Sequence, residues 1–239
     1  MKRISLLLFA TLISIGVNAQ KTYALLTGVS NYGVQGANLQ NTTKDVKQLK
    51  KVLDKQGMIV TTLTSSNATI PNMEKKLNAI IQLAKPEDKI IFFFSGHGDT
   101  GQILAYGPEA FYYRDLMKIL SKAKTTEVFC FIDACMSGSV SPTEYDWVDA
   151  HKGVSFMMSS RADEYSTENN WIGHGFYTQA LLKGLRGKAD INDDRKITLM
   201  ELFRYVYNDV TARTRNNNQT QHPMLIGPSS SHDTVITRW

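Results

Sequence analysis

The chain has only two cysteines among its 239 residues, Cys130 and Cys135. Both fall in or next to one apolar run that is typical of a β-strand. Extended chain between them spans about 16 Å, whereas the Cα atoms of a disulfide lie within roughly 7 Å of each other. We therefore expect two unpaired thiols. Burial is a sufficient reason for Cys130 but does not account as easily for Cys135.

The sequence also lacks the ligand spacings of zinc proteins. It contains no Cys-x-x-Cys pair and no His-Glu-x-x-His segment, and a zinc site needs three or four suitable ligands. A catalytic or structural zinc centre is therefore not expected, and we expect the chemistry of the protein to need no cofactor.

An excess of one charge sign is nearly absent. The chain carries 27 basic and 22 acidic residues, a formal charge of +5. The lysines and arginines look scattered rather than arranged along one stripe, and no nucleic-acid-binding motif occurs. Nucleic acid is therefore not expected as the primary partner.

Long hydrophobic runs are missing apart from one near the N-terminus. Lys2 and Arg3 precede an apolar stretch over residues 4–17, and small residues end at Ala19. This stretch is shorter than the roughly 20 residues of a membrane-spanning helix. Residues 1–19 are thus typical of a cleaved signal peptide, with a membrane anchor as the alternative. We expect an exported protein, periplasmic or secreted, without a stable membrane anchor after cleavage.

The remaining sequence alternates apolar runs with amphipathic segments, and 42% of the chain is hydrophobic. This length and composition favour one α/β domain over residues 20–239, in which helices cover both faces of a mostly parallel sheet. The expected strands are 23–28, 58–63, 89–95, 127–133 and 154–159. The expected helices are 44–55, 72–83, 113–122, 176–185 and 199–211.

Two of the expected strands end in reactive side chains. The strand at 89–95 leads into His97 between two glycines, and the strand at 127–133 leads into Cys135, followed closely by Gly138. Parallel strands bring their carboxyl ends to one edge, where ligands gather in open α/β sheets. An imidazole beside a thiol produces the thiolate that acts as nucleophile near neutral pH. This pattern favours a cysteine hydrolase.

These motifs resemble the caspase-like cysteine peptidases, and within them the metacaspase and paracaspase branch. "FFFSGHGD" is similar to the histidine motif of the family and "FIDACMSGS" to its nucleophile motif. "MSSRADEYSTE" and "GHGFYTQALLKGL" resemble the portion that completes the substrate pocket. The resemblance implies a three-layer sandwich with roughly six strands. The resemblance divides the chain into three portions. They are a part similar to a large subunit over about 20–138, a loop over about 139–152 and a part similar to a small subunit over about 153–239.

The resemblance also assigns roles to individual residues. His97 is implied as general base and Cys135 as nucleophile, with the backbone N–H groups of Gly98 and Cys135 receiving the oxyanion. No third orienting residue is evident. A second Gly-His-Gly segment contains His174, but it precedes a predicted helix instead of ending a strand, so His97 is the preferred base.

Substrate preference is implied by the acidic residues that match the family pattern. Asp133 lies two positions before Cys135, on the same side of an extended strand. In metacaspases the matching aspartate lines a pocket for arginine or lysine. Asp45, Ser95 and Glu168 match further residues of this pocket. We therefore expect protein or peptide substrates with Arg or Lys before the cleaved bond. Asp45 has an alternative interpretation as an acidic residue in the first turn of a helix, where the helix dipole favours it. Glu168 has an alternative interpretation as a residue of a solvated loop.

An acidic segment near the C-terminus has the ligand spacing of an EF-hand. In "DINDDRKITLME" the side chains at loop positions 1, 3, 5, 9 and 12 predict a calcium site. Arg195 occupies position six, where the sharp turn favours glycine. The alternative is an acidic turn before a helix. The predicted ligands are Asp190, Asn192, Asp194, Thr198 and Glu201.

Lys152 lies in the expected loop between the two portions. Specificity for Arg or Lys makes it a candidate site of self-cleavage, and an ordinary surface lysine is the alternative. Two other functions stay open at this point. One is a caspase-like fold with an idle catalytic pair that binds peptides or a partner. The other is a thiol amidase or transpeptidase that acts on small substrates.

Overall fold

The computed structural model describes residues 19–135, 137–138, 153–161, 168–169, 174–217 and 219–239. The predicted signal peptide therefore lies almost entirely outside the described residues. In the part that is described, no helix combines the length and the apolar character needed to span a membrane.

A six-stranded sheet forms the centre of the molecule, with strand order β12-β8-β7-β3-β1-β2. All neighbouring strands are parallel except β12, which pairs antiparallel with β8. The predicted mostly parallel α/β architecture is confirmed. The strands are β1 (Thr22–Gly28), β2 (Ile59–Thr64), β3 (Lys89–Ser95), β7 (Val128–Asp133), β8 (Val154–Met158) and β12 (Met224–Ile226).

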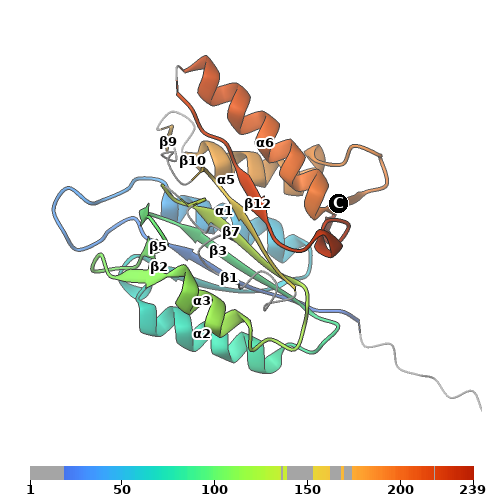
Figure 1. Cartoon of the computed structure of the whole chain (residues 1–239), viewed down its shortest axis with the longest axis horizontal. Helices are drawn as coiled ribbons and strands as arrows, with labels where there is room; N and C mark the ends of the chain where they lie inside the picture. Colours follow the sequence, from blue (N-terminus) through green and yellow to red (C-terminus); the bar gives the residue numbers. More distant parts are fainter. Residues whose placement is uncertain (1–18, 136, 139–152, 162–167, 170–173, 218) are drawn as a thin grey trace, which may run out of the picture.

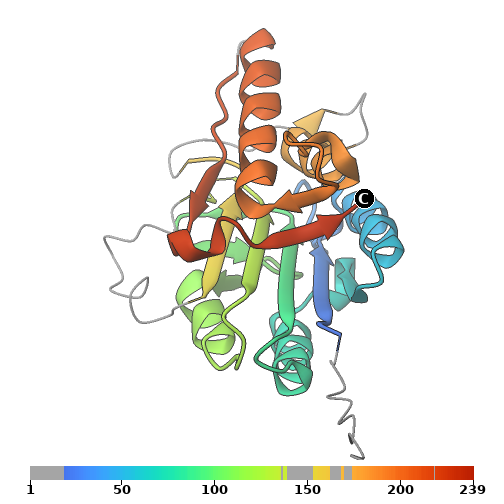
Figure 2. The same cartoon turned by 90° about the vertical axis from the view of Figure 1, so that its right-hand side faces the viewer.

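Helices cover both faces of this sheet (Figures 1 and 2). Side chains of α2 (Ile70–Leu83) and α3 (Tyr113–Leu120) belong to the core on one face. Side chains of α1 (Thr42–Lys55), α5 (Phe176–Lys183) and α6 (Leu199–Asn216) belong to the core on the other. The result is a three-layer sandwich.

The two central strands explain why their sequences are apolar throughout. In β3, Phe92 and Phe94 point to the core beneath α2 and α3, while Phe93 points to the opposite core. In β7, Cys130 and Phe131 alternate in the same way. Burying each phenylalanine contributes about 1.5–3 kcal/mol. A strand covered on both faces needs no polar side, as these runs predicted.

Several short elements were not predicted from the sequence. Hairpin strands follow β3, and the chain from residue 184 onward adds short helices and a small two-stranded sheet. These elements are η1 (Ser65–Asn67), β4 (Gly98–Asp99), β5 (Gln102–Leu104), β6 (Ala110–Tyr112), β9 (Glu168–Asn169), β10 (His174–Gly175), η2 (Gly184–Lys188), β11 (Lys196–Thr198), η3 (Ser229–Ser231) and β13 (Val235–Arg238).

The strand register brings the reactive segments to one edge of the sheet. Ser95 at the end of β3 is opposite Gly28 of β1 and Asp133 of β7. The residues that follow β3 and β7 therefore emerge side by side. His97 and Cys135 both lie just beyond this row.

Candidate active site

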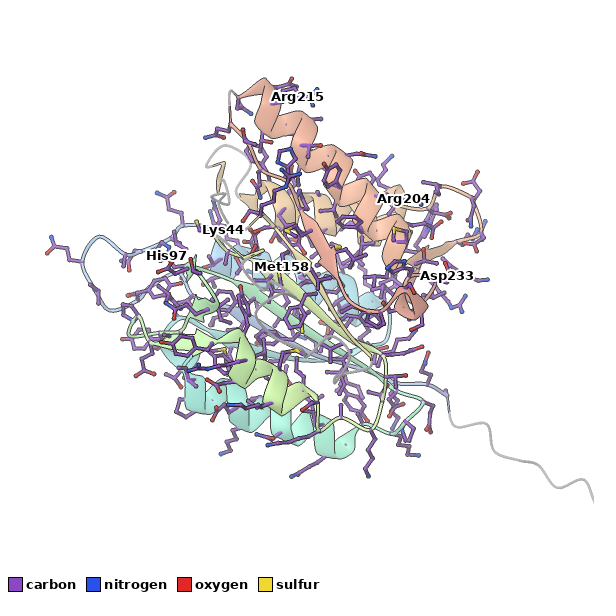
Figure 3. The ribbon with its side chains drawn as sticks, viewed as in Figure 1. Lys44, His97, Met158, Arg204, Arg215 and Asp233 are labelled. Carbon is purple, nitrogen blue, oxygen red and sulfur yellow. The ribbon has the colours of Figure 1, made fainter. Side chains whose placement is uncertain are left out.

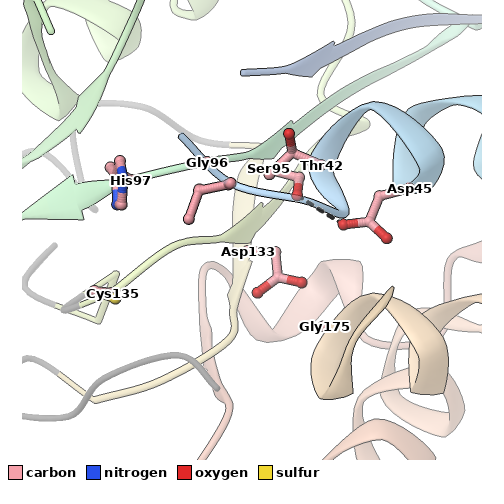
Figure 4. Close-up of a pocket in the computed structure, with 9 residues that line it drawn as sticks. Thr42, Asp45, Ser95, Gly96, His97, Asp133, Cys135 and Gly175 are labelled. Carbon is pink, nitrogen blue, oxygen red and sulfur yellow. Dashed lines mark hydrogen bonds between the residues drawn. The ribbon is translucent and has the colours of Figure 1, made fainter. Parts of the chain in front are cut away.

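A cavity of about 90 Å³ lies at the carboxyl edge of the sheet. Both predicted catalytic side chains line it, as do three of the residues predicted to bind substrate (Figure 4). The structure thus brings together five residues from three separate segments of the sequence. The cavity is lined by Leu39, Thr42, Asp45, Ser95, Gly96, His97, Asp133, Cys135 and Gly175.

Backbone and ring contacts hold His97 in this cavity. Its N–H donates a hydrogen bond of 2.6 Å to the hydroxyl of Tyr32, whose ring centroid lies 4.9 Å from the imidazole. Nε2 lies 2.9 Å from the carbonyl oxygen of Ala37. Because a carbonyl only accepts, Nε2 carries the hydrogen and the neutral ring keeps its lone pair on Nδ1. Nδ1 is therefore the atom able to accept a proton.

These two partners of His97 were missed by sequence reasoning. The orienting group at Ala37 is a main-chain oxygen, which every residue type supplies, so no side-chain signal marks it. Tyr32 lies in the segment between β1 and α1, where no motif distinguished it. The third orienting group that the sequence left open is thus supplied by the backbone.

The segment around Cys135 is fixed to the end of β8 by buried serines. Ser159 Oγ accepts from the N–H of Ala134 and donates to the carbonyl of the same residue, at 3.1 and 3.0 Å. The N–H of Ser160 donates to Ser137 Oγ, and Gly138 N–H donates to the Ser160 carbonyl. Cys135 is therefore held between two anchored residues, with its side chain partly exposed.

The other thiol has a different environment. Cys130 is fully buried in β7, and burial raises the pKa of its thiol far above the ordinary value. It therefore stays protonated and packs as a small apolar side chain. As expected, Cys130 and Cys135 do not form a disulfide with each other.

Gly98 allows the two loops to approach closely. A Cβ atom at this position would lie 2.7 Å from the carbonyl oxygen of Cys135 and 2.8 Å from Cβ of Ala134. Any side chain there would push the loop of His97 away from the loop of Cys135. The predicted oxyanion role of the Gly98 N–H stays a prediction, and the steric need for glycine is a finding.

Two buried carboxylates give the cavity its negative character. Asp45 is 1% exposed and accepts a hydrogen bond of 2.8 Å from Ser95 Oγ. Asp133 is 7% exposed, and its Oδ2 accepts from both the N–H and the hydroxyl of Thr178, at 3.2 and 2.7 Å. Thr178 was not identified from the sequence. Charged groups are costly to bury, so two in one cavity favour a cationic ligand.

Two glycines position these carboxylates. A Cβ atom at Gly28 would lie 2.6 Å from the Thr42 carbonyl, so the first turn of α1, with Asp45, packs directly on the end of β1. A Cβ atom at Gly175 would lie 2.8 Å from Asp133 Oδ2. Larger residues at either position would displace a pocket carboxylate.

Three other candidates can be placed only in part. The backbone of Glu168 pairs with Gly175, which lines the cavity, but its side chain is outside the described residues. The side chain of His174 is outside them as well. Lys152, the predicted self-cleavage position, is not described at all.

The predicted calcium loop adopts sharp turns without gathering its ligands. Arg195 takes φ 60°, the left-handed conformation that favours glycine at this position. Asp190 accepts from the Arg195 N–H, and Glu201 accepts from the N–H and hydroxyl of Thr198. In the described part of the chain no group of three His, Cys, Asp or Glu side chains is placed to hold a metal. Calcium binding stays a prediction.

A thiol and an imidazole that line one cavity at the carboxyl edge of an α/β sheet are the arrangement of a cysteine hydrolase. The chain belongs to the caspase domain family, peptidase C14, whose model matches residues 21–233. Members of this family are cysteine peptidases that act on protein substrates. The resemblance found in the motifs is therefore confirmed at the level of the family.

Solved structures agree on the fold. Caspase-1 from Spodoptera frugiperda superposes with a TM-score of 0.68 at 17% sequence identity, covering 87% of this chain and 86% of that chain. Protein GSU0716 from Geobacter sulfurreducens superposes with a TM-score of 0.63 at 16% identity, covering 90% and 97%. At such identities the likeness establishes the fold alone. No curated protein matches the chain.

Proposed function

We propose that this protein is a cysteine endopeptidase that hydrolyses peptide bonds after arginine or lysine. The observation that carries the proposal is one cavity lined by His97, Cys135 and the buried carboxylates of Asp45 and Asp133. The first pair supplies a nucleophile and a base, and the second pair supplies negative charge for a basic side chain.

The mechanism follows from the hydrogen bonds of His97. Nδ1 accepts the thiol proton of Cys135, and the Ala37 carbonyl stabilises the resulting imidazolium through Nε2–H. The thiolate attacks the carbonyl carbon, and backbone N–H groups receive the oxyanion. Nδ1–H then protonates the leaving amine as the C–N bond breaks. Water, activated by the neutral imidazole, hydrolyses the thioester and restores the thiol.

The pocket acids support a basic residue before the cleaved bond. A guanidinium places two parallel N–H donors against a carboxylate, and an ammonium donates as a point charge, so arginine is preferred over lysine. An aspartate at this position would bring a third negative charge into the cavity. The acidic pocket also supports placing the chain near the metacaspase and paracaspase branch.

The decisive experiment uses an affinity probe and a peptide panel. A lysine chloromethylketone should label the wild-type protein on Cys135, and Cys135→Ala should abolish labelling and turnover. Among otherwise identical peptides, kcat/KM should follow Arg, then Lys, with Asp far below. Binding of peptides without labelling or cleavage would favour an idle binding module instead. Preference for Asp would overturn the specificity.

Export and self-cleavage belong to the same proposal. The N-terminal segment supports export, and Lys152 offers a basic residue within the predicted loop. Intact-mass measurement of wild type beside Cys135→Ala should show cleavage after Lys152 in the wild type only. An intact chain in both proteins, with masses that differ only by the substitution, would exclude self-cleavage.

A further inference from the structure

The outer side of α1 carries a row of lysines. Helix α1 buries Val46, Leu49, Val52 and Leu53 against the sheet, which leaves four of its five lysines exposed to solvent; Lys50 is partly buried. Their spacing of three, four and four positions aligns them along one side of the helix. At 1.5 Å per residue the row is about 16 Å long. We call it the basic row, formed by Lys44, Lys47, Lys51 and Lys55. The expectation of scattered basic residues was wrong here.

The basic row ends in a surface groove of about 500 Å³. The side chains of Val52 and Leu185 are buried at its floor, and Lys51, Lys55 and Arg186 are exposed at its rim. We call this the basic groove. It is lined by Lys51, Val52, Asp54, Lys55, Gln56, Leu185 and Arg186.

The charges at the rim are not neutralised within the described structure. Asp54, the acid of the groove, forms an ion pair of 2.7 Å with Lys50. Over the residues the structure describes, none of Lys51, Lys55 and Arg186 has a carboxylate within 4.0 Å. Like charges four positions apart, as at 47, 51 and 55, also destabilise a helix. An anionic partner would relieve this repulsion.

The basic row starts at the candidate active site. Lys44 directly precedes Asp45, which lines the catalytic cavity, and Figure 3 shows Lys44 at the same end of the molecule as His97. From there α1 runs toward the opposite edge of the sheet, with α5 beside it on the same face (Figures 1 and 2). A chain that leaves the cavity along α1 therefore passes each lysine in turn.

We propose that the basic row and the basic groove bind an extended, acidic segment of a protein substrate. Side chains on one side of an extended strand repeat about every 7 Å, and lysines four positions apart on a helix repeat every 6 Å. A segment with Asp or Glu at alternate positions therefore matches the row. An aliphatic side chain fits the apolar floor of the groove, whereas single-stranded nucleic acid favours aromatic platforms. The assignment to substrates rests on the proposed peptidase function, and the binding itself does not.

Binding is tested on the full-length Cys135→Ala protein. A fluorescent peptide of alternating Glu and Leu should bind by anisotropy, and affinity should fall with added salt. The double variant Lys51→Glu/Lys55→Glu should weaken binding about tenfold or more. The matched control is Lys75→Glu/Lys76→Glu, which reverses two exposed charges on α2, across the sheet, and should bind as before. Equal loss in both variants, or tighter binding of oligothymidylate than of the peptide, would overturn the proposal.

Turnover separates this surface from the peptidase assignment. Two test substrates share the same arginine cleavage site and differ only in their tails. One tail alternates Glu and Leu, and the other alternates Gln and Leu. The acidic tail should raise kcat/KM in the wild type and in the α2 control, and the α1 variant should lose that advantage. Peptide binding without any cleavage would contradict the peptidase function and support the surface. Cleavage with no advantage and no peptide binding would contradict the surface alone.

Discussion

At the scale of single residues, Thr178 is the clearest addition to the candidate pocket. It supplies two of the hydrogen bonds to Asp133 Oδ2, through its N–H and its hydroxyl, and it is itself fully buried. It does not line the cavity among the described residues, so it acts through the carboxylate it orients. It is therefore a positioning residue.

Thr178→Val keeps the shape of the side chain and removes the hydroxyl donor. A hydrogen bond to a charged group contributes about 1.5–3 kcal/mol, so we expect kcat/KM for arginine substrates to fall about ten- to hundredfold. The loss should appear mainly in KM, and Thr178→Ser should restore most of it. An unchanged KM together with a lower melting temperature would indicate a purely structural role.

Tyr113 predicts how stability depends on alkaline pH. Burial raises the pKa of its phenol far above the ordinary value, so the folded protein keeps a proton that the unfolded chain releases above pH of about 10. Stability should therefore fall as pH rises past that value, by about 1.4 kcal/mol per unit for this group. Its hydroxyl has no hydrogen-bond partner among the described residues, so Tyr113→Phe should cost little at neutral pH.

The measurement is urea unfolding at several pH values from neutral to strongly alkaline. Tyr113→Phe should reduce the alkaline loss of stability, while Tyr112→Phe, at an exposed position, should leave it unchanged. The buried Tyr177, whose pKa burial also raises, should keep part of the slope in both variants. Equal slopes in wild type and Tyr113→Phe would contradict this account.

Residue-scale prediction from the sequence succeeded where a side chain ends a strand. His97, Cys135, Ser95 and Asp133 follow apolar runs whose parallel pairing brings them to one edge, and the structure places them around one cavity. Tyr32 and the Ala37 carbonyl were missed because contacts through the backbone and through unremarkable loop residues leave no pattern in the sequence. The catalytic roles of His97 and Cys135 and the binding roles of Ser95 and Asp133 stay predictions.

At the scale of elements, the residues at the start of α6 have two proposed roles, a helix cap and a calcium site, which can be tested against each other. Thr198 and Glu201 form a capping box, with each side chain bonded to the backbone N–H of the other. The same two residues were predicted as calcium ligands. The two roles differ in their dependence on calcium.

Glu201→Ala should lower the unfolding free energy by about 1 kcal/mol in calcium-free buffer, because α6 loses its cap. Calcium binding by the loop would add a rise in the wild-type melting temperature on adding the ion, absent from the variant. If calorimetry detects no heat of calcium binding and calcium leaves the wild-type melting temperature unchanged, the calcium site is contradicted. The capping role of Glu201 is not affected by that result.

Element prediction was reliable where periodicity was strong and failed where elements were short. The five predicted strands and five predicted helices are present, with ends shifted by a few residues. The antiparallel strand β12 and the three-stranded sheet of β4, β5 and β6 were missed because each strand has only two or three residues, too few to show an alternating pattern. The basic row of α1 was missed although its spacing of three and four positions is visible in the sequence.

At the scale of the whole molecule, the reactivity of the two thiols measures different things. Cys135 reports on access to the cavity in the folded protein, and Cys130 reports on unfolding. Cys135 lines a cavity, so a soluble thiol reagent should reach it in the folded state. Cys130 is fully buried in β7, between β3 and β8, beneath helices on the core side. Its sulfur becomes accessible only when the sheet separates from that layer.

This difference makes Cys130 a probe of global unfolding. In Cys135→Ala, which retains Cys130 as the sole thiol, labelling should be slow and should accelerate with urea in parallel with the unfolding constant. The free energy from labelling should then equal that from circular dichroism of the same variant. Faster labelling that depends weakly on urea would show that β8 and β12 open locally, so that this lateral edge of the sheet is less stable than the sheet centre. Because Cys130 and the nucleophile loop share β7, that outcome would couple opening of the sheet edge to loss of the catalytic geometry.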